Sequence, residues 1–599
     1  MAWNLGTTTV RNPTRIREGL TLFSNEFAGN IRGADRERLF WRRLKETGIV
    51  DDVNVEAGLE YVPGTTDDMN GRKWRATFKK LGFISGDRFR RFPAATVRFQ
   101  DLVEENLGLT GVPYEVTPIG RRLIAATTPG AIQDIFLRQL LRLEITSPVE
   151  DEGEDFRVKP LVLVLQILDA LEARNMKGVN REEIAAFIQT AHDHTGIASR
   201  IEAIVAHRLA REQERGRVAR SRFDAAARNA AGSGAGIQGD SLRDYADTTF
   251  RYLRMSGLFS VEGKRLRLRP ERRVAIDKIL EVEPVFIAQT DPKQYLVQFY
   301  RGGTIPTDDS NTALAIIQRY ADLLTQRGIE PRVQAFQLEG RTDHEIEAAR
   351  HEIQEQYKTE REREYVHSHS TNDETIQDTL EYLKKLGGDD TAEAEIDDDP
   401  SFLEWATWRG LLVFNSLRGE PNKTRNFQID EDMRPVGTAP GGRPDIVMSY
   451  PDFLLVAEVT MMRGSRQEAA EGEPVRRHVS DVFTQNADGR DVYGLFVAPV
   501  IDLNTTETFR VGTWYRQGVR RQLSIVPIRL ETYTSLISSM IARRRTPAEL
   551  RQLLDECLAS RQHEAPEWLE SIEDHVETWI TGDRPAGNLL ATIRSDAQN

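Results

Sequence analysis

A predicted β-hairpin in the last third of the chain constrains the fold more than any other feature. Two runs of strand length, 443–450 and 453–460, flank the turn-forming pair Pro451-Asp452. This pattern predicts two strands joined by a tight turn. Asp445 stands at the start of the first strand and Glu458 near the end of the second. An antiparallel pair returns to its starting edge, so we expect both carboxylates at one end of a sheet, able to share a divalent cation.

The residue types around this hairpin predict a metal-dependent nuclease. A hard cation such as Mg²⁺, for which Mn²⁺ is a plausible substitute, activates water and screens the charge that grows on a phosphodiester during hydrolysis. A predicted helix upstream carries Glu404, and a charged cluster downstream contains Glu473, Arg477 and His478. Gathering these charges is costly unless an ion and a phosphate neutralise them. The alternative is an ordinary hairpin, because a Pro-Asp turn before a strand that ends in Glu is common.

Several motifs together resemble the AlwI-type restriction endonucleases, which are type IIS enzymes with some strand-nicking relatives. They are Phe-Leu-Glu-Trp-Ala-Thr-Trp at 402–408, Phe-Gln-Ile-Asp-Glu at 427–431, Pro444-Asp445, Glu458-Val459-Thr460, 473–478, and the familiar stretches 247–254 and 256–259. The resemblance covers most of the chain. It implies a PD-(D/E)XK nuclease core, a central mixed sheet flanked by helices.

The resemblance also implies how the metal is held. Asp445 and Glu458 would bind Mg²⁺, helped by the main-chain carbonyl of Val459. Glu404, the upstream acid of the motif, would orient a second ion or its waters.

One position departs from the general nuclease motif. Thr460 stands where a lysine is usual, which leaves the role of orienting the attacking water without an obvious owner. Glu473 or His478 is the candidate for that role, acting on the water or on the scissile phosphate. Arg477 would offer positive charge to that phosphate.

Composition indicates a large protein without membrane spans. A chain of 599 residues exceeds one core and predicts three or more domains. No apolar run is long enough to cross a bilayer, so we expect a cytoplasmic location. The lone Cys557 excludes an internal disulfide and a thiolate zinc cluster. The net charge of −13 hides basic stretches at 208–228 and 265–273, which leaves DNA binding open.

The N-terminal half predicts two DNA-reading modules in a multidomain α+β protein. A basic helix near residues 70–81 carries Lys73 and Arg75, and a strand and a new helix follow it, which is the rhythm of a winged helix. The rhythm recurs in a helix with Arg251 and Arg254, followed by a predicted hairpin whose Glu-Gly turn, beside Lys264, would form the wing. A solvated surface face is the alternative for either basic helix taken singly.

The predicted boundaries follow from these modules. We expect winged-helix-like subdomains at 1–150 and 151–285, a helical linker at 286–395 and a PD-(D/E)XK catalytic domain at 396–599. Within the catalytic domain, 492–499 and 523–528 predict buried strands, and 505–517 and 531–543 predict helices.

The function predicted is a sequence-specific endonuclease that cuts or nicks double-stranded DNA a few bases outside an asymmetric site. The alternatives are a non-enzymatic DNA-binding regulator with a degenerate nuclease fold, or a nuclease triggered by modified or damaged DNA. Expected partners are a second copy paired transiently through the catalytic domains or a separate small nuclease subunit, and a cognate methyltransferase in the same system.

Overall fold

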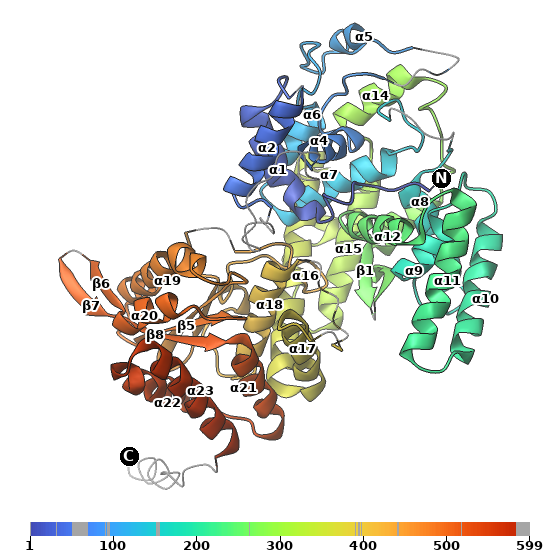
Figure 1. Ribbon diagram of the computed structural model, residues 1–599. Coiled ribbons are helices and arrows are strands. Elements are labelled where there is room, and N and C mark those ends of the chain that lie inside the picture. The colour runs from blue at the N-terminus through green and yellow to red at the C-terminus, as the bar shows by residue number, and fades with distance from the viewer. Residues whose placement is uncertain are drawn as a thin grey trace. The chain divides into compact units, whose positions relative to one another are not determined.

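The computed structural model describes residues 2–582 of the chain, apart from residues 32, 51–69, 90–91, 93–95, 151–155, 263, 390, 393, 395, 397, 440–441 and 517. It is a mixed α+β structure that is mostly helical (Figure 1). The chain divides into two compact units, Met1–Tyr357 and Lys358–Asn599. The part of the chain that the structure describes contains no helix long and apolar enough to cross a membrane.

Unit 1 is built mainly of helices around one large apolar core, with a two-stranded hairpin. The buried residues that form this core are spread over the sequence from Trp3 to Tyr357. The strands are β1 (Phe259–Glu262) and β2 (Arg265–Leu268), which pair in antiparallel fashion. The helices are α1 (Ile16–Glu26), α2 (Ala34–Glu46), α4 (Asn70–Lys80), α5 (Phe99–Val103), α6 (Pro118–Ala125), α7 (Pro129–Arg142), α8 (Pro160–Glu172), α9 (Arg181–Glu183), α10 (Ile197–Gln213), α11 (Arg217–Ala235), α12 (Gly239–Arg254), α13 (Arg273–Leu280), α14 (Pro292–Arg301) and α15 (Ser310–Gln326).

The residues predicted as a helical linker, 286–395, contribute to the cores of both units. Tyr295, Phe299 and Tyr320 on α14 and α15 are buried in the core of unit 1. The boundary between the units falls within α16 (Asp343–Thr371), and α17 (Asp373–Leu386) belongs to the core of unit 2.

Unit 2 contains a four-stranded mixed sheet with the order β3-β4-β5-β8. The strands β3 (Ile446–Ser449) and β4 (Phe453–Val459) are antiparallel, while β4 pairs in parallel with β5 (Asp491–Ala498), and β5 with β8 (Ser524–Arg529). A separate ribbon is formed by β6 (Thr513–Arg516) and β7 (Val519–Gln522). The helices are α18 (Asp399–Leu412), α19 (Arg466–Gln485), α20 (Leu503–Val511), α21 (Leu530–Ala542), α22 (Pro547–Ala559) and α23 (Ala565–Thr581).

Helices cover both faces of this sheet because its strands are apolar on both sides. Successive β5 side chains point to opposite faces. On one face, Phe496 contacts Phe509 of α20 with ring centroids 5.1 Å apart, and Gly494 lies against Val479 of α19. On the other face, Leu495 lies in an apolar layer formed with α18, α21, α22 and α23. Both faces of the central sheet are therefore buried. Polar groups can be placed at the ends of its strands.

The prediction of one helix over 505–517 is wrong at its C-terminal half. Helix α20 ends at Val511, and Gly512 takes a left-handed conformation with φ of 50°. A residue in this conformation ends a helix, and glycine adopts it without steric cost. The following residues form strand β6 instead. The predicted strands at 492–499 and 523–528 differ from β5 and β8 by one residue at each end.

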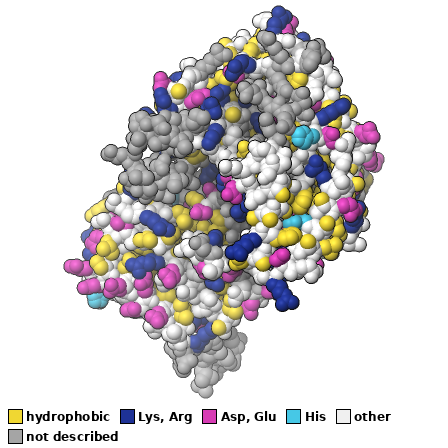
Figure 2. All heavy atoms as spheres, turned by 45° about the vertical axis from the view of Figure 1, so that its right-hand side comes forward, with side chains coloured by type: hydrophobic (Ala, Val, Ile, Leu, Met, Phe, Trp, Pro, Cys, Tyr) yellow, Lys and Arg dark blue, Asp and Glu magenta, His cyan; other side chains and the backbone are white. Residues whose placement is uncertain are grey.

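Acidic and basic side chains are mixed over the face of the molecule seen in Figure 2. Figure 2 shows one face of the molecule, on which Lys and Arg are interspersed with Asp and Glu. The excess of acid over base in the whole sequence therefore does not produce a uniformly acidic face in this view.

Candidate active site

The hairpin β3–β4 brings Asp445 and Glu458 to the same end of the sheet. Its register aligns Ile446 with Ala457, so the next pair outward is Asp445 and Glu458. The Asp445 Oδ2 accepts a hydrogen bond from the Val459 amide at 3.0 Å, which fixes the carboxylate against the end of β4. Glu458 is a neighbour of Phe496 on β5, so both carboxylates lie on the sheet face covered by α19 and α20.

Helix α19 supplies two more polar groups to this end of the sheet. The His478 imidazole is buried, and its Nδ1 lies 2.7 Å from Glu458 Oε1. Glu471 lies close enough for its charge to act on both Asp445 and Glu458, and its carboxylate accepts a hydrogen bond from the Thr460 hydroxyl. Glu471 and His478 are seven residues apart, which places them on one face of a helix. The site therefore combines three carboxylates with one imidazole.

Burial and mutual repulsion perturb the protonation of these groups. Burial, followed by the charge of Glu458, raises the pKa of Asp445 well above its usual range. Burial and the charge of Glu471 likewise raise the pKa of Glu458. Burial raises the pKa of Glu471, and the hydrogen bond from Thr460 opposes this rise. In such surroundings the charged form of each carboxylate is destabilised. A cation bound between the carboxylates would stabilise that form.

The imidazole of His478 is held neutral. Burial, together with the positive charge of Arg477, lowers the pKa of His478. A neutral ring in contact with a carboxylate donates its Nδ1–H to Glu458 and leaves Nε2 as an acceptor. Among the described residues, no group forms a hydrogen bond with Nε2, although this atom is buried. The site therefore contains an unpartnered basic nitrogen beside its carboxylates.

Glu404 and Glu473 are the other two acids predicted for the site. Glu404 is buried on α18, and its Oε2 accepts a hydrogen bond from the Ala439 amide at 2.8 Å. After burial, the charges of Glu458 and Glu471 raise the pKa of Asp445, and the charge of Glu471 raises the pKa of Glu458, so Glu471 is grouped with the pair. Glu473 lies on the outer side of α19, 55% exposed, and forms an ion pair with Arg477 at 3.1 Å.

Sequence reasoning missed Glu471 because it did not recognise α19 as a helix. Pro474 lies inside α19, and Gly464 and Gly472 add to the appearance of a loop. The signal that was available is the spacing of Glu471, Val475 and His478, which repeats at helical intervals. Assigning a helix there would have placed Glu471, and not Glu473, on the helix face that carries Val475 and His478.

The first predicted DNA-binding pair lies on α4, most of which is covered. Arg75 forms an ion pair with Glu37 at 2.6 Å and lies over the ring of Tyr114 at 4.4 Å. Lys73 is half-buried on the same helix. The Arg75 side chain therefore already has partners within unit 1, and DNA would have to compete with them.

The second predicted group lies on α12 and the β1–β2 hairpin. Arg251 pairs with Asp247 at 3.0 Å, and Arg254 is half-buried at the last turn of α12. Lys264 is exposed next to the turn between β1 and β2, with a φ of 65°. The turn residue Gly263 lies outside the described residues. Lys264 is the member of this group that is presented to solvent.

A tighter cluster of possible metal ligands lies in unit 1. Asp134, Glu347 and His351 are the group of three, within the described residues, whose ligand atoms all lie within 4.8 Å of one another. The Asp134 Oδ2 already faces the Arg350 guanidinium at 2.5 Å and His351 Nε2 at 3.2 Å. The fixed positive charge of Arg350 repels a cation, so this cluster serves as an ion-pair network between α7 and α16.

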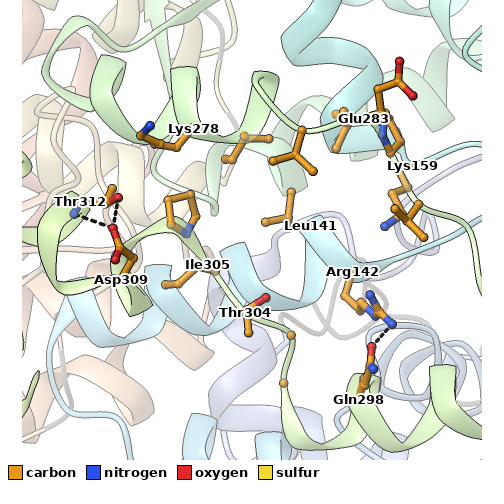
Figure 3. A pocket seen from close by; sticks show the side chains of 18 of the residues that line it. Leu141, Arg142, Lys159, Lys278, Glu283, Gln298, Thr304, Ile305, Asp309 and Thr312 are labelled. Atoms are coloured by element: carbon orange, nitrogen blue, oxygen red, sulfur yellow. Dashed lines mark hydrogen bonds between the residues drawn. The ribbon is translucent and has the colours of Figure 1, made fainter.

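Unit 1 also contains an open cavity of about 780 Å³ (Figure 3). Apolar side chains such as Leu141 and Ile305 line it together with the cations Arg142, Lys159 and Lys278. None of the predicted DNA-binding or catalytic residues lines this cavity. This cavity is therefore separate from the predicted catalytic and DNA-binding residues.

Comparison with known proteins identifies the class of enzyme and then its family. Residues 81–536 match the model of a restriction endonuclease family, which makes the protein a restriction-type DNA endonuclease, a hydrolase that acts on DNA. The matching model is that of the AlwI restriction endonuclease, and the chain belongs to this family. The matched segment includes all four site residues, Asp445, Glu458, Glu471 and His478.

One solved structure and the curated proteins complete the comparison. The small subunit (R.BspD6I2) of the heterodimeric restriction endonuclease R.BspD6I is similar to 33% of this chain and 98% of its own, with 24% sequence identity and a TM-score of 0.27. No curated protein matches the chain.

Proposed function

We propose that the protein is a divalent-metal-dependent type II endonuclease that cuts or nicks double-stranded DNA a few bases outside an asymmetric recognition site. The observation that carries this proposal is the register of β3 and β4, which sets Asp445 against Glu458 beside Glu471 and His478 of α19. A mixed sheet with paired acids at a strand end and helices on both faces is the expected form of a PD-(D/E)XK nuclease core.

The residues of this site fit Mg²⁺, with Mn²⁺ as a substitute. Mg²⁺ is bound through one or two carboxylates and keeps several waters, so Asp445, Glu458 and the Val459 carbonyl suffice to hold it. Burial and, after it, repulsion between carboxylates raise the pKa values of both acids, and a bound cation would offset both effects. When bound, the ion supplies an activated water and screens charge on the scissile phosphate. Glu404 is retained as a group that acts on a second ion or its waters.

The remaining residues orient water and phosphate. Thr460 replaces the usual lysine of the motif, and its hydroxyl holds the Glu471 carboxylate. We assign to Glu471 the role of orienting the attacking water, a role also open to Glu473. His478 positions Glu458 through its Nδ1–H and offers Nε2 to a proton near the site. Arg477 offers charge to the phosphate.

The reading half of the proposal rests on unit 1. Helix α12 followed by the β1–β2 hairpin has the order of a winged helix, and the exposed Lys264 lies where the wing would meet DNA. Lys73, Arg75, Arg251 and Arg254 are proposed to support DNA binding from α4 and α12. We retain 1–150 and 151–285 as reading subdomains, 286–395 as the connection and 396–599 as the catalytic domain.

Substitution of Asp445 tests the proposal. We expect Asp445→Asn to lower Mg²⁺-dependent cleavage of a supercoiled plasmid at least about a thousandfold, because the ion loses a charged ligand. DNA binding in a gel-shift assay should persist, since unit 1 is unchanged. Asp452→Asn, in the exposed turn of the same hairpin, is the matched control and should cut normally. Wild-type rates from the Asp445→Asn protein would remove Asp445 from the site.

The same assay separates the two alternative functions. Thr460 in place of lysine is the observation that favours a non-enzymatic DNA-binding regulator, which would bind DNA and cut neither unmodified nor modified substrates. A modification- or damage-dependent nuclease would cut modified or damaged DNA alone. A cognate methyltransferase is expected beside the enzyme proposed here, so methylated DNA should resist it.

A further inference from the structure

One face of the ribbon β6–β7 packs on helix α19, and the other face is exposed. Opposed residues of an antiparallel pair share a face, and successive residues alternate between faces. The register pairs Trp514 with Arg521 and Tyr515 with Arg520, so these two pairs lie on opposite sides of the ribbon. In Figure 1 the ribbon projects from unit 2 beside α19 and α20.

The inner face packs on α19 through cation–aromatic contacts. The Arg476 guanidinium lies 5.7 Å from the centre of the Trp514 ring, and the Arg521 guanidinium lies 4.2 Å from the centre of the Phe483 ring. Arg476 precedes His478 by two residues on the same helix. The ribbon is therefore tied to the element that carries the Glu471 and His478 side chains of the proposed site.

The base of the ribbon is also held by hydrogen bonds. The Gln522 side chain donates to the Val511 carbonyl at 2.9 Å, and the Leu523 amide donates to the Gly512 carbonyl at 2.7 Å. These bonds close the ribbon where it leaves α20 and enters β8. A ribbon fixed at its base presents its outer face in a defined position relative to the site.

The outer face and the tip combine exposed aromatic, apolar and cationic side chains. Tyr515 is 66% exposed and Val519 is 55% exposed. Arg520, the cross-strand neighbour of Tyr515, is exposed as well. The surrounding sequence contains no acidic residue between Glu507 and Glu531, although acids exceed bases by 13 over the whole chain. This local excess of positive charge favours a polyanion.

The dimensions of the ribbon suit a DNA groove. Each strand has four residues, which at about 3.4 Å per residue gives a length of about 14 Å. The major groove is about 12 Å wide and about 8.5 Å deep and admits a two-stranded ribbon. A guanidinium and a tyrosine hydroxyl are both donors to phosphate oxygens.

We propose that the β6–β7 ribbon binds double-stranded DNA beside the bond that is cut, with Tyr515 and Arg520 contacting the sugar-phosphate backbone. This inference rests on the proposed nuclease function and deepens it, because it assigns a DNA contact to the cutting unit itself. Through α19, that contact sets the distance between the DNA backbone and the Glu458–His478 pair. The ribbon is thus a positioning element for the strand to be cleaved.

Photocrosslinking tests the contact without requiring cleavage. A photoreactive amino acid replaces Tyr515 in the full chain, and the protein is irradiated with short duplexes of random sequence. The matched control carries the same amino acid at Gln377, exposed on α17 of the same unit. We expect a protein–DNA adduct from position 515 and none from position 377. Adducts between two protein copies, or no DNA adduct when a gel shift shows all DNA bound, would overturn the proposal.

A charge reversal tests the consequence for cutting. We expect Tyr515→Ser with Arg520→Glu to slow plasmid nicking about tenfold and to weaken its salt dependence by about one unit of log–log slope. Lys384→Glu on α17 makes the same charge change away from the ribbon and should leave the rate unchanged. An unchanged rate and salt slope in the ribbon variant overturns the positioning role. Wild-type protein that fails to cut refutes the nuclease proposal instead, and the adduct at position 515 still decides the DNA contact.

Discussion

At the scale of single residues, two glutamates of α19 have different surroundings: Glu471 lies in the proposed site and Glu473 lies on the surface. Glu471 and Glu473 are two positions apart, which turns their side chains to different sides of the helix. Glu471 interacts with Thr460 and acts on the charges of Asp445 and Glu458. Glu473 is exposed and pairs with Arg477. The two residues therefore form a matched pair for testing which carboxylate orients the water.

We expect Glu471→Gln to slow plasmid nicking about a hundredfold, because the amide cannot accept the proton of the attacking water. Glu473→Gln should change the rate by less than about threefold, since it breaks only an exposed ion pair. Single-turnover rates with Mg²⁺ in excess measure both effects. The reverse ranking would give the role to Glu473.

The buried acids also make the stability of the metal-free protein depend on pH. The pKa values of Asp445, Glu458 and Glu471 are raised in the folded protein. The folded chain then binds these protons more tightly than the unfolded chain, so the free energy of unfolding falls as pH rises above the ordinary carboxyl range near 4 and through the raised values.

We therefore expect Asp445→Asn to raise the melting temperature of the metal-free protein at pH 8 and to reduce the stabilisation given by Mg²⁺. Removing one buried charge relieves the repulsion and also removes an ion ligand. Thermal melts with EDTA and with Mg²⁺, with Asp452→Asn as control, provide the measurement. An Asp445→Asn protein that melts lower without metal and keeps the full Mg²⁺ shift contradicts the assignment.

At the scale of elements, local patterns predicted the hairpin and missed the elements around it. The turn Pro451-Asp452 and the apolar strands beside it are local signals, and they predicted β3 and β4 together with the closeness of their ends. Helix α19 was missed because Pro474 and Gly472 weaken helical propensity, and packing against β4 and β5 outweighs that weakness. The β6–β7 ribbon was missed because its strands are short and polar. The ribbon is held by contacts with α19, which no local pattern encodes, and by the hydrogen bonds at its base.

Another element-scale feature is a buried arginine that holds α16, α17 and α18 together. Arg409 of α18 is 2% exposed and lies 4.4 Å from the centre of the Trp405 ring. Its guanidinium donates to His369 Nε2 of α16 at 2.8 Å and pairs with Asp378 of α17 at 2.7 Å. Burial, followed by the charge of Arg409, lowers the pKa of His369 to about 3. The imidazole therefore serves as a neutral acceptor.

This histidine makes the second unit sensitive to acid. The unfolded chain protonates His369 near pH 6.5, whereas the folded protein does so only near 3, so the free energy of unfolding falls as pH is lowered between these values. We expect His369→Gln to flatten the fall of the melting temperature between pH 6.5 and 4. The exposed His367→Gln, two residues away, is the control. Equal acid slopes in the wild type and the His369→Gln protein would contradict this role.

At the scale of the whole molecule, the family match spans both compact units. Residues 81–536 include most of unit 1 and the entire sheet of unit 2. The helix α16 passes from one unit to the other without a break. The predicted domain boundaries, including the helical linker at 286–395, stay predictions, and long charged helices such as α16 do not reveal their buried faces in the sequence. Tyr320, Ile353 and Tyr357 show that such helices also build the core.

The proposed site uses one Asp445 and one Glu458, so one chain hydrolyses one strand in one event. We expect open-circular plasmid to form first, at a rate that is first order in protein. Linear product should follow with a higher order, because cutting the second strand requires a second catalytic unit beside the first. A plasmid time course at several protein concentrations measures both orders.

Mixing the wild type with the Asp445→Asn protein distinguishes paired cutting from independent nicking. If two copies pair on the DNA, a mixed pair has a single working site and stops at the nick, so added Asp445→Asn protein lowers linear product while open circles persist. If each chain acts alone, the added protein only competes for DNA and lowers both products together. Because Asp445→Asn leaves unit 1 and the β6–β7 ribbon intact, both proteins should occupy DNA equally. At equal consumption of supercoiled plasmid, a constant ratio of linear to open-circular product would therefore exclude pairing of catalytic units.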